Sequence, residues 1–386
     1  MSIPRPTPQK VVPALLKQED GLRIIRLSGS PAELGYAHGR LLAPEIHEIK
    51  RGLLNYLAKI TAWAGGWPLY LGLALLARRF RPFIPGPYWE EMQGVAAGAE
   101  IGVYLILLLN VFDDLAQNLP RCSALAARSN DGRNSSWLLA RNLDYAVFTE
   151  VMVRLQTVFL LYPAGGLPLL SVAWPGFVGL YSGLNQSQVA LAQLSAMTVD
   201  RTFKGCPAGI RNRQALEQGH NLPEVACWLT AGPRTTGNNL MLCSPEDAVV
   251  LELSARCWEP RPATQGLIIA TNHYQSVGMQ SLKGRFPTRP PFSPLSPWHF
   301  TEAYSQSRQR RLEELAASGV EISKAQAMLA DPQVANPGTV TSIIFEPQDL
   351  NLWLAQSLTP PVATGPWRRL SQLFSDSGPD IEPVPD

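Results

Sequence analysis

Three residues whose side chains could together perform nucleophilic catalysis lie at the two ends of one predicted β-hairpin. Cys122 begins a run of strand-forming residues, and Arg141 and Asp144 end a second run. The stretch between the two runs is rich in turn residues around Gly132, which is typical of a hairpin. Counting ten residues in each direction from that glycine places 141–144 beside Cys122. Directly opposite residues of an antiparallel pair lie about 4.5–5.5 Å apart, which is within reach of their side chains.

A thiol, a guanidinium and a carboxylate at such distances have two interpretations. A thiolate is a nucleophile, and a neighbouring cation lowers the pKa of a cysteine. Equally, a cysteine at the start of a strand is often a small buried hydrophobic residue, and an Arg/Asp pair is often a surface salt bridge. Spacing alone leaves both interpretations open.

The elements that must position these residues predict a mixed fold. Before Cys122 the pattern is helical, with a capping box at 30–33 and a helix expected to run past Leu53. Residues 1–20 are expected to form a loose arm, and residues after Thr359 a Pro-rich tail. Blocks of helix beside many strands favour an α+β class over a parallel βαβ sheet. The strand candidates are 22–27, 123–127, 137–140, 153–161, 169–174, 179–184, 189–194, 239–243, 249–253, 267–270, 339–345 and 351–355.

Composition excludes several classes of protein. The 386 residues are 46% hydrophobic and 17% charged, which is a globular composition. The formal net charge of +2 gives no argument for nucleic-acid binding, and we expect none. GxGxxG, GxxxxGK[ST], GxSxG, CxxC and HExxH motifs are all missing from the sequence, and the five cysteines do not form a disulfide framework. Because residues 1–10 contain no apolar run, we expect no signal peptide and a cytoplasmic location.

The run Trp63–Ala77 is apolar throughout and is followed by three arginines within the next four residues. Fifteen residues are too few to span a bilayer, which needs about 20. One interpretation is a core segment. The other is an apolar surface near the binding pocket, with the arginines meeting lipid headgroups.

Six motifs in order resemble those of the penicillin acyltransferase family, over residues 28–358. The block around Cys122 is also similar to choloylglycine hydrolases and acid ceramidase. The motifs are GSPAELGYAHG at 29–39, YWEEMQGVAAGAEIGVYLILLLN at 88–110, CSALAARS…DGR…ARNLDY from Cys122 to 145, GLNQSQVAL at 183–191, GNNLML at 237–242 and ATNHY at 270–274.

Members of this family are N-terminal-nucleophile hydrolases, so the resemblance implies a four-layer αββα fold of two antiparallel sheets between helices. It also implies an inactive precursor that cuts itself before the cysteine. The cut would separate a helical segment, 1–121, from a catalytic piece, 122–358, that carries the 359–386 tail. The new α-amino group, with an ordinary pKa of about 7.7–8.0, can take the thiol proton, so no histidine is needed. No spacing singles out a histidine as a base, and His38 is expected to pack.

The resemblance assigns roles to individual residues. Cys122 matches the nucleophile, Asp144 the acid that holds the terminal amine, and Arg141 the arginine beside the thiol. Asn272 matches the side-chain donor to the oxyanion, although a turn residue is the alternative without the resemblance. Asn239 is a weaker candidate for the same donor, and a residue at the end of a strand is the favoured alternative.

The sequence matches a related family at Arg308 and departs from the expected pattern at two other places. Arg308, with a second arginine three residues later, is similar to a Ser-Arg-x-x-Arg stretch of choloylglycine hydrolases, and a solvated helix face is the alternative. Penicillin acyltransferases carry a Ser-Arg pair before the late strand, where 336–338 here read Asn-Pro-Gly. Arg121 also differs from the small residue of the relatives before the cut.

These observations predict a self-processing cysteine amidohydrolase that acts on a linear N-acyl bond through a thioester, with no metal or organic cofactor. The expected partner is a small-molecule acyl amide. Water gives hydrolysis and an amine gives acyl transfer, and the sequence leaves both open. A non-catalytic relative that binds ligand in its pocket is the alternative from another class. The oligomeric state is left open.

Overall fold

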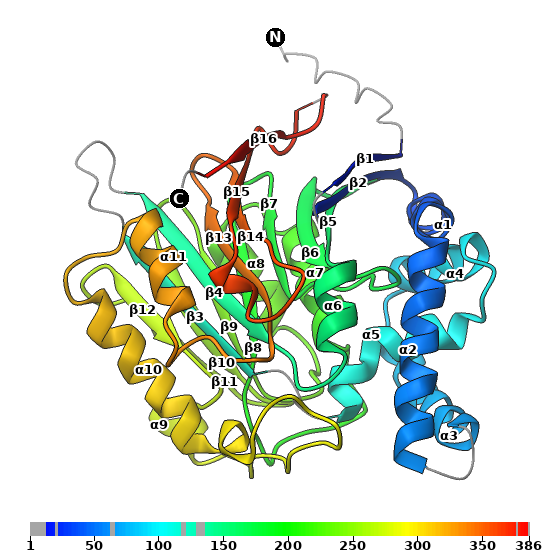
Figure 1. Ribbon diagram of the computed structural model, residues 1–386, viewed down its shortest axis with the longest axis horizontal. Coiled ribbons are helices and arrows are strands. Elements are labelled where there is room, and N and C mark those ends of the chain that lie inside the picture. The colour runs from blue at the N-terminus through cyan, green and yellow to red at the C-terminus, as the bar shows by residue number, and fades with distance from the viewer. Residues whose placement is uncertain are drawn as a thin grey trace.

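Two β-sheets face one another in the computed structural model, which describes residues 13–19, 22–61, 66–116, 121–128, 136–375 and 377–384 (Figure 1). The larger sheet has the order β1 (Ala14–Glu19), β2 (Leu22–Gly29), β5 (Thr157–Pro163), β6 (Leu169–Ala173), β7 (Ser182–Asn185), β8 (Ala190–Ser195), β9 (Asn238–Cys243), β10 (Ala248–Leu253) and β11 (Trp258–Pro262). The smaller sheet has the order β12 (Leu267–Ala270), β3 (Arg121–Arg128), β4 (Trp137–Asp144), β13 (Thr339–Glu346), β14 (Asn351–Ala355), β15 (Trp367–Ser371) and β16 (Asp380–Pro383).

Helices cover the outer face of each sheet. Helices α10 and α11 pack on the smaller sheet, and α7 and α8 pack on the larger one, which confirms the predicted αββα layering (Figure 1). The helices are α1 (Pro31–Leu41), α2 (Ala43–Thr61), α3 (Trp67–Ala77), α4 (Gly86–Gly98), α5 (Val103–Ala116), α6 (Thr149–Leu155), α7 (Ala208–Gln218), α8 (Leu222–Thr230), α9 (Val277–Gln280), α10 (Glu302–Ala316) and α11 (Ile322–Ala330), with 3₁₀ turns at Arg78–Phe83, Pro297–Phe300 and Val362–Thr364.

The predicted hairpin of β3 and β4 is present, and its register lies within one residue of the expected pairing. Cys122 is opposite Leu143, Arg121 is opposite Asp144, and Ser123 is opposite Asn142. The predicted turn around Gly132 lies outside the described residues. Because side chains alternate along a strand, Cys122 and Arg141 share one face of the hairpin, and Arg121 and Asp144 share the other.

Glycines explain two of the sequence motifs near the start of the chain. A Cβ atom on Gly35 of α1 would lie 2.0 Å from a backbone oxygen of α4. A Cβ atom on Gly98 of α4 would lie 2.3 Å from a backbone oxygen of α1. Only glycine permits so close a contact between two helix backbones. The glycines of both motifs therefore serve helix packing.

Several local expectations differ from the structure. The expected arm contains β1, and the expected tail contains β15 and β16, which extend the smaller sheet because Trp367 and Leu370 bury their side chains. The single long helix is two helices, because Pro44 lacks an N–H and starts a new helix after Leu42. The sheets are not wholly antiparallel, since β2 pairs with β5 in parallel.

The N-terminal elements are joined to the rest of the molecule by more than helix packing. Strand β2 lies directly beside β5, so the larger sheet contains segments from both sides of the Arg121–Cys122 bond. A buried ion pair with 3.7 Å between its nearest atoms links Glu91 of α4 to Arg213 of α7, and Arg213 also binds Glu217 at 3.0 Å. Residues before and after that bond thus share one core.

Helix α3 is not a core segment, although its composition allows that interpretation. Only Ala74 and Ala77 of α3 are buried, whereas Trp67, Leu71 and Leu75 are 52%, 56% and 62% exposed. The first part of the predicted run, residues 63–65, lies outside the described residues. Within the described ranges, no helix combines the length and the hydropathy needed to cross a bilayer.

Candidate active site

Cys122 lies at the start of β3 with its thiol buried against a fixed guanidinium. Arg141 Nη2 donates to Cys122 Sγ at 3.1 Å, from the shared face of the hairpin. Arg141 Nη1 in turn donates to the carbonyl of Tyr181 at 3.1 Å and to Ser182 Oγ at 2.7 Å. These contacts with the larger sheet hold the guanidinium at the sulfur, so the sequence-predicted pair of Cys122 and Arg141 is brought together.

Burial and charge act in opposite directions on the thiol. Burial raises the pKa of Cys122 above its ordinary value, and Arg141 acts to lower it. Because burial dominates, the thiol of the uncut chain is protonated near neutral pH and needs a base before it can attack. His38 is not that base: burial lowers its pKa to about 3, and its Nε2 accepts from the backbone N–H of Gly176 at 2.8 Å. None of the five histidines, all within described residues, is hydrogen-bonded to Cys122.

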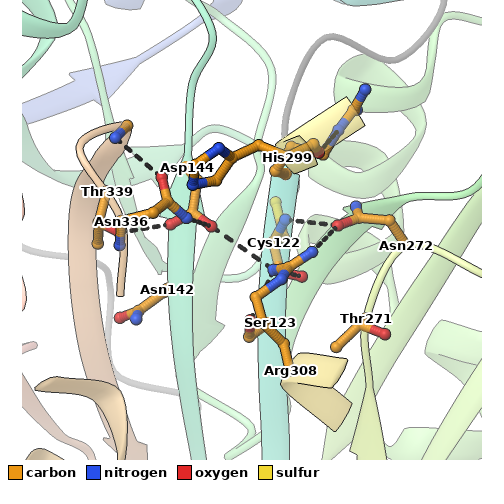
Figure 2. A network of polar contacts seen from close by, with 12 residues as sticks. Cys122, Ser123, Asn142, Asp144, Thr271, Asn272, His299, Arg308, Asn336 and Thr339 are labelled. Carbon is orange, nitrogen blue, oxygen red and sulfur yellow. Dashed lines mark hydrogen bonds and ion pairs between the residues drawn. The ribbon is translucent and has the colours of Figure 1, made fainter. Parts of the chain in front are cut away.

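Asp144 lies on the opposite face of the hairpin from the thiol, so its carboxylate does not meet the sulfur as the spacing suggested. It accepts from Thr339 Oγ1 and Asn336 Nδ2, each at 2.7 Å, and lies 3.5 Å from Arg308 Nη1 (Figure 2). Burial raises the pKa of Asp144, and the charge of Arg308 opposes that rise. The role of Asp144 as holder of the terminal amine stays a prediction.

Arg308 connects the groups of the site from the outer side of the smaller sheet. Its side chain is fully buried, which rules out the solvated helix face for this residue. Nη1 donates to the carbonyl oxygen of Cys122 and to Ser123 Oγ, each at 2.7 Å, and Nη2 donates to Asn272 Oδ1 at 2.7 Å (Figure 2). Arg308 therefore bridges the backbone of Cys122, Asp144 and Asn272.

Asn272 presents its oxygen, not its nitrogen, to the backbone of Cys122. The backbone N–H of Cys122 donates to Asn272 Oδ1 at 2.9 Å, and Asn272 Nδ2 donates to the carbonyl of Ser195 at 2.8 Å. Both partners of Oδ1, Cys122 N and Arg308 Nη2, are donors, which sets this orientation. In the uncut chain Asn272 thus holds the nitrogen of the bond before Cys122, and its expected role as oxyanion donor stays a prediction.

Asn239 acts on Asn272 rather than on the thiol. Its Nδ2 donates to the carbonyls of Thr271 and His273, each at 2.9 Å, and so clamps the backbone on both sides of Asn272. Ser305 Oγ accepts from the backbone N–H of Asn272 at 2.8 Å. This backbone support was not predicted from the sequence, although Asn239 does lie near the start of β9, as the strand-end alternative expected.

Asn336 and Thr339 were also missed as members of the site. Asn336 stands where the resemblance led us to expect a Ser-Arg pair, and it holds Asp144 together with the hydroxyl of Tyr304, to which its Nδ2 donates at 3.0 Å. One signal was available: Thr339 begins a predicted strand, and the structure pairs it directly with Asp144. A departure from the family pattern therefore marks a residue that contacts the site.

An apolar cavity of about 110 Å³ lies beside Tyr145 and Tyr181, and the carbonyl of Tyr181 accepts from Arg141. Its walls include Phe112 of α5 and Phe148, together with Tyr145 and Tyr181 on the side of the site. Asp113 of α5 accepts from the Tyr145 hydroxyl, which fixes that ring. Because α2 and α5 precede Cys122 and the remaining walls follow it, the cavity is built from both sides of the Arg121–Cys122 bond.

Comparison with known proteins gives one family and several relatives. A family model described as acyl-coenzyme A:6-aminopenicillanic acid acyl-transferase matches residues 129–356. Protein dcd1A of Dictyostelium discoideum is 31% identical over 189 residues, which are 43% of this chain and 42% of that protein. The 40 kDa form of the acyl-coenzyme A:6-aminopenicillanic-acid-acyltransferase of Emericella nidulans is 26% identical over 258 residues, 64% of this chain and 68% of that protein.

Among solved structures, an N-acylethanolamine-hydrolyzing acid amidase ortholog of Caenorhabditis elegans aligns with a TM-score of 0.45 and 15% identity, over 58% of this chain and 93% of that one. The present chain spans less than half of the length of the Dictyostelium protein. The match to the family model begins after Cys122 and so does not include the predicted nucleophile.

Proposed function

Because the chain belongs to the acyl-coenzyme A:6-aminopenicillanic acid acyl-transferase family, we propose that it is a self-processing cysteine amidohydrolase. The observation that carries the proposal is the buried contact of Arg141 Nη2 with Cys122 Sγ at 3.1 Å. A fixed cation at a sulfur stabilises the thiolate that forms when a base removes the proton. Arg308, at 2.7 Å from the Cys122 carbonyl, adds a second cation to the same residue.

The first proposed step is cleavage of the bond before Cys122. The thiol adds to the carbonyl carbon of Arg121, so that an S–C bond forms and the C–N bond breaks. The thiol proton ends on the nitrogen, which becomes a free amine. Water then hydrolyses the thioester, which releases Arg121 with a carboxylate and restores the thiol. The two pieces would have 121 and 265 residues.

The second proposed step is the catalytic cycle. The free α-amine of Cys122 takes the thiol proton, and the thiolate attacks the carbonyl of an acyl amide. The protonated amine then gives its proton to the leaving amine, and a thioester remains. Water completes hydrolysis and regenerates the thiol, whereas an entering amine takes the acyl group instead. Asp144 is proposed to hold the ammonium, and Arg141 to stabilise the thiolate.

The apolar cavity beside Tyr145 and Tyr181 supports an apolar acyl group on the substrate. None of the described residues that line it carries a charge. Burial of an apolar chain there would contribute about 25 cal/mol per Å² removed from water. The proposed substrate class is therefore an N-acyl amide with an apolar acyl chain.

A second proposal concerns the surface of α3. Trp67, Leu71 and Leu75 lie on one side of this helix, and the exposed Arg78 and Arg79 follow at its end. An exposed apolar stripe that ends in cations fits the interface of an anionic bilayer. We propose that α3 brings the enzyme to a membrane surface, where acyl amides with apolar chains collect.

The test of the main proposal is intact mass followed by a substrate panel. Two pieces with Cys122 at a new amino terminus, and turnover of N-acyl amides, would support a processed enzyme. Parallel reactions with and without an acceptor amine would separate acyl transfer from hydrolysis. A single uncut chain without turnover would leave the non-catalytic binding protein as the better account.

A further inference from the structure

Helix α5 presents three polar side chains to segments that lie on the other side of the proposed cut. Asn110, Asp113 and Asp114 are spaced i, i+3 and i+4, so they share one face of the helix, and all three are buried. A buried polar group is unfavourable unless it has a hydrogen-bond partner. The partners of these side chains therefore indicate what this face of α5 does.

Asn110 fixes the segment that leads to Tyr181. Its Oδ1 accepts from the backbone N–H of Val178 at 2.7 Å and from that of Gly179 at 3.1 Å. Its Nδ2 donates to the carbonyl of Gly176 at 2.9 Å. Three hydrogen bonds from one side chain of α5 thus set the path of the backbone up to Tyr181.

Asp113 holds the rings of two tyrosines. Its carboxyl group accepts from the hydroxyl of Tyr145, and the hydroxyl of Tyr181 also interacts with it and acts to lower its pKa. Tyr145 directly follows β4, whereas Tyr181 directly precedes β7. One carboxyl group of α5 therefore connects the ends of strands that belong to different sheets.

Tyr181 lies next to the guanidinium that contacts the thiol. Its carbonyl accepts from Arg141 Nη1 at 3.1 Å, and Ser182, the next residue, accepts from the same nitrogen at 2.7 Å. Arg141 Nη2 donates to Cys122 Sγ at 3.1 Å. A shift of the Tyr181 ring would move the backbone that carries these acceptors. Asp113 thus reaches the thiol through Tyr181 and Arg141.

Tyr145 provides a second connection from the same carboxyl group. It directly follows Asp144, whose backbone N–H is hydrogen-bonded to the thiol of Cys122 and acts to lower its pKa. The backbone N–H of Tyr145 donates to the carbonyl of Gly338 at 2.7 Å, while Asp113 holds the ring. These two contacts keep the end of β4 beside the sulfur.

We propose that Asp113 is a positioning residue for the thiol of Cys122, which it reaches through the two tyrosines. The inference rests on the proposed function and adds a residue of the N-terminal segment to the parts that the reaction needs. Asp113 acts through other side chains, so it is not itself a catalytic residue. A misplacement of about 1 Å at a reacting group can lower a rate about 10²-fold, so a distant tether can matter for turnover.

The charges near the thiol distinguish positioning from a simple effect of charge. Arg141 and Arg308 act to lower the pKa of the thiol, and Asp144 acts to raise it. The groups around Asp113 are the two tyrosine hydroxyls and the carboxyl group of Asp114. If only the negative charge of Asp113 acted on the thiol, its removal would lower the thiol pKa. If Asp113 positions the donors at the sulfur, its removal raises that pKa.

The test measures the reactivity of Cys122 with iodoacetamide against pH, in the full-length chain after cutting has been verified by mass. Peptide mapping identifies the modified residue, because the chain has five cysteines. In Asp113→Ala we expect a higher midpoint of the pH profile and turnover of octanoyl 4-nitroanilide about 10–100-fold below wild type. Asp113→Asn keeps an acceptor oxygen in the same place and should restore most of both quantities.

Asp114→Ala is the matched control. Asp113 and Asp114 are 5% and 6% exposed and lie side by side on α5. Asp114 accepts from Thr235 Oγ1 and, at 3.2 Å, from the backbone N–H of Ala208 at the start of α7, rather than from the two tyrosines. Its replacement should lower the temperature of unfolding, while the folded variant keeps the wild-type pH profile and turnover.

Two further variants remove the hydroxyls and keep the rings. Tyr145→Phe and Tyr181→Phe should each raise the midpoint of the pH profile. Combined with Asp113→Ala, each should add less than its separate effect, because the residues act through one set of contacts. These variants also decide the question where Asp113→Ala does not fold. A wild-type profile in both phenylalanine variants would overturn the proposal.

Failure of this proposal can be distinguished from failure of the proposed function. A cut Asp113→Ala chain with wild-type turnover, or with a lower midpoint, overturns the positioning role and leaves the amidohydrolase in place. Equal losses of turnover in Asp113→Ala and Asp114→Ala also overturn it, because they would reflect stability alone. A wild-type chain that stays uncut and turns over no amide overturns the proposed function itself.

Discussion

Arg308 places a buried guanidinium 2.7 Å from the carbonyl oxygen of Cys122, although 186 residues separate the two along the chain. The same guanidinium lies 3.5 Å from the buried carboxylate of Asp144 in β4 and neutralises its charge. Removal of one partner of a buried pair leaves an uncompensated charge, which typically costs 3–5 kcal/mol. Arg308 therefore affects both stability and activity.

Arg308→Lys tests this position with the charge retained. Lysine cannot reproduce the fork that reaches Cys122, Ser123 and Asn272 together, so we expect kcat to fall about 10–100-fold while the fold survives. The measurement is turnover beside thermal unfolding. Arg310→Lys, at an exposed position of the same helix, is the control and should change neither quantity. Wild-type turnover in Arg308→Lys would show that the fork is dispensable.

Cys122→Ala should leave one uncut chain of 386 residues without activity. Attack on the Arg121 carbonyl needs a nucleophilic atom on residue 122, and alanine has none. Cys122→Ser should cut slowly and turn over poorly, because a hydroxyl is a much weaker nucleophile than a thiolate. Intact mass and N-terminal sequencing of the variants beside the wild type show whether the side chain of residue 122 makes the cut. The same cleavage in Cys122→Ala would point to a contaminating protease.

Asn272→Ala should lower turnover about 10²–10³-fold, the usual effect of losing one oxyanion donor. It should also slow the cut, because the Cys122 N–H loses the oxygen that it binds at 2.9 Å in the uncut chain. Single-turnover assays and a time course of processing separate the two effects. Slow processing with normal turnover after cutting would limit Asn272 to the precursor and move the oxyanion donor elsewhere.

Asp114→Asn should flatten the dependence of stability on pH. Burial raises the pKa of Asp114 from 3.8 to about 7, so the folded chain holds this proton more tightly than the unfolded chain. That contribution to stability is fully present below pH 3.8 and is lost as pH rises through about 7. Each pH unit in that window costs about 1.4 kcal/mol per group. Thermal unfolding from pH 4 to 8 should show a weaker decline in the variant, and an unchanged decline would contradict the assignment.

Replacement of Trp67, Leu71 and Leu75 together by serine should abolish pelleting with vesicles of anionic lipid, if α3 is the contact with membranes. Hydrolysis of a water-soluble amide should stay at the wild-type rate, because the three side chains are exposed and α3 packs chiefly on α5 and α2. Trp228→Ser, at an exposed position of α8, is the matched control. Equal pelleting of the triple variant and the wild type would rule out α3 as the membrane contact.

The hairpin could be predicted from the sequence because its signals are local. Turn residues near Gly132 fixed the pairing to within one residue and so placed Arg141 near Cys122. What spacing could not supply was the face of each side chain. A shift of one residue in register moves a side chain to the other face, which is why Asp144 was expected at the thiol and lies on the outer side.

Contacts between distant segments could not be predicted from spacing. Arg308 came from resemblance alone, and nothing in the pattern of its charged helix distinguishes it from the exposed Arg310. Asn336 interrupts a family motif, yet the structure shows it holding Asp144. Composition likewise could not decide whether α3 is buried, because that depends on which helices pack against it.

Strand β2 lies in parallel beside β5, and the proposed cut falls between them in the chain. This arrangement changes the order of the folding reaction. The uncut precursor can bring the two strands together in a unimolecular step, at a rate independent of concentration. The cut pieces must find one another, so renaturation becomes bimolecular and slows with dilution. The enzyme would thus be able to fold efficiently only once, as a precursor, and a processed molecule that unfolds at low concentration would not recover.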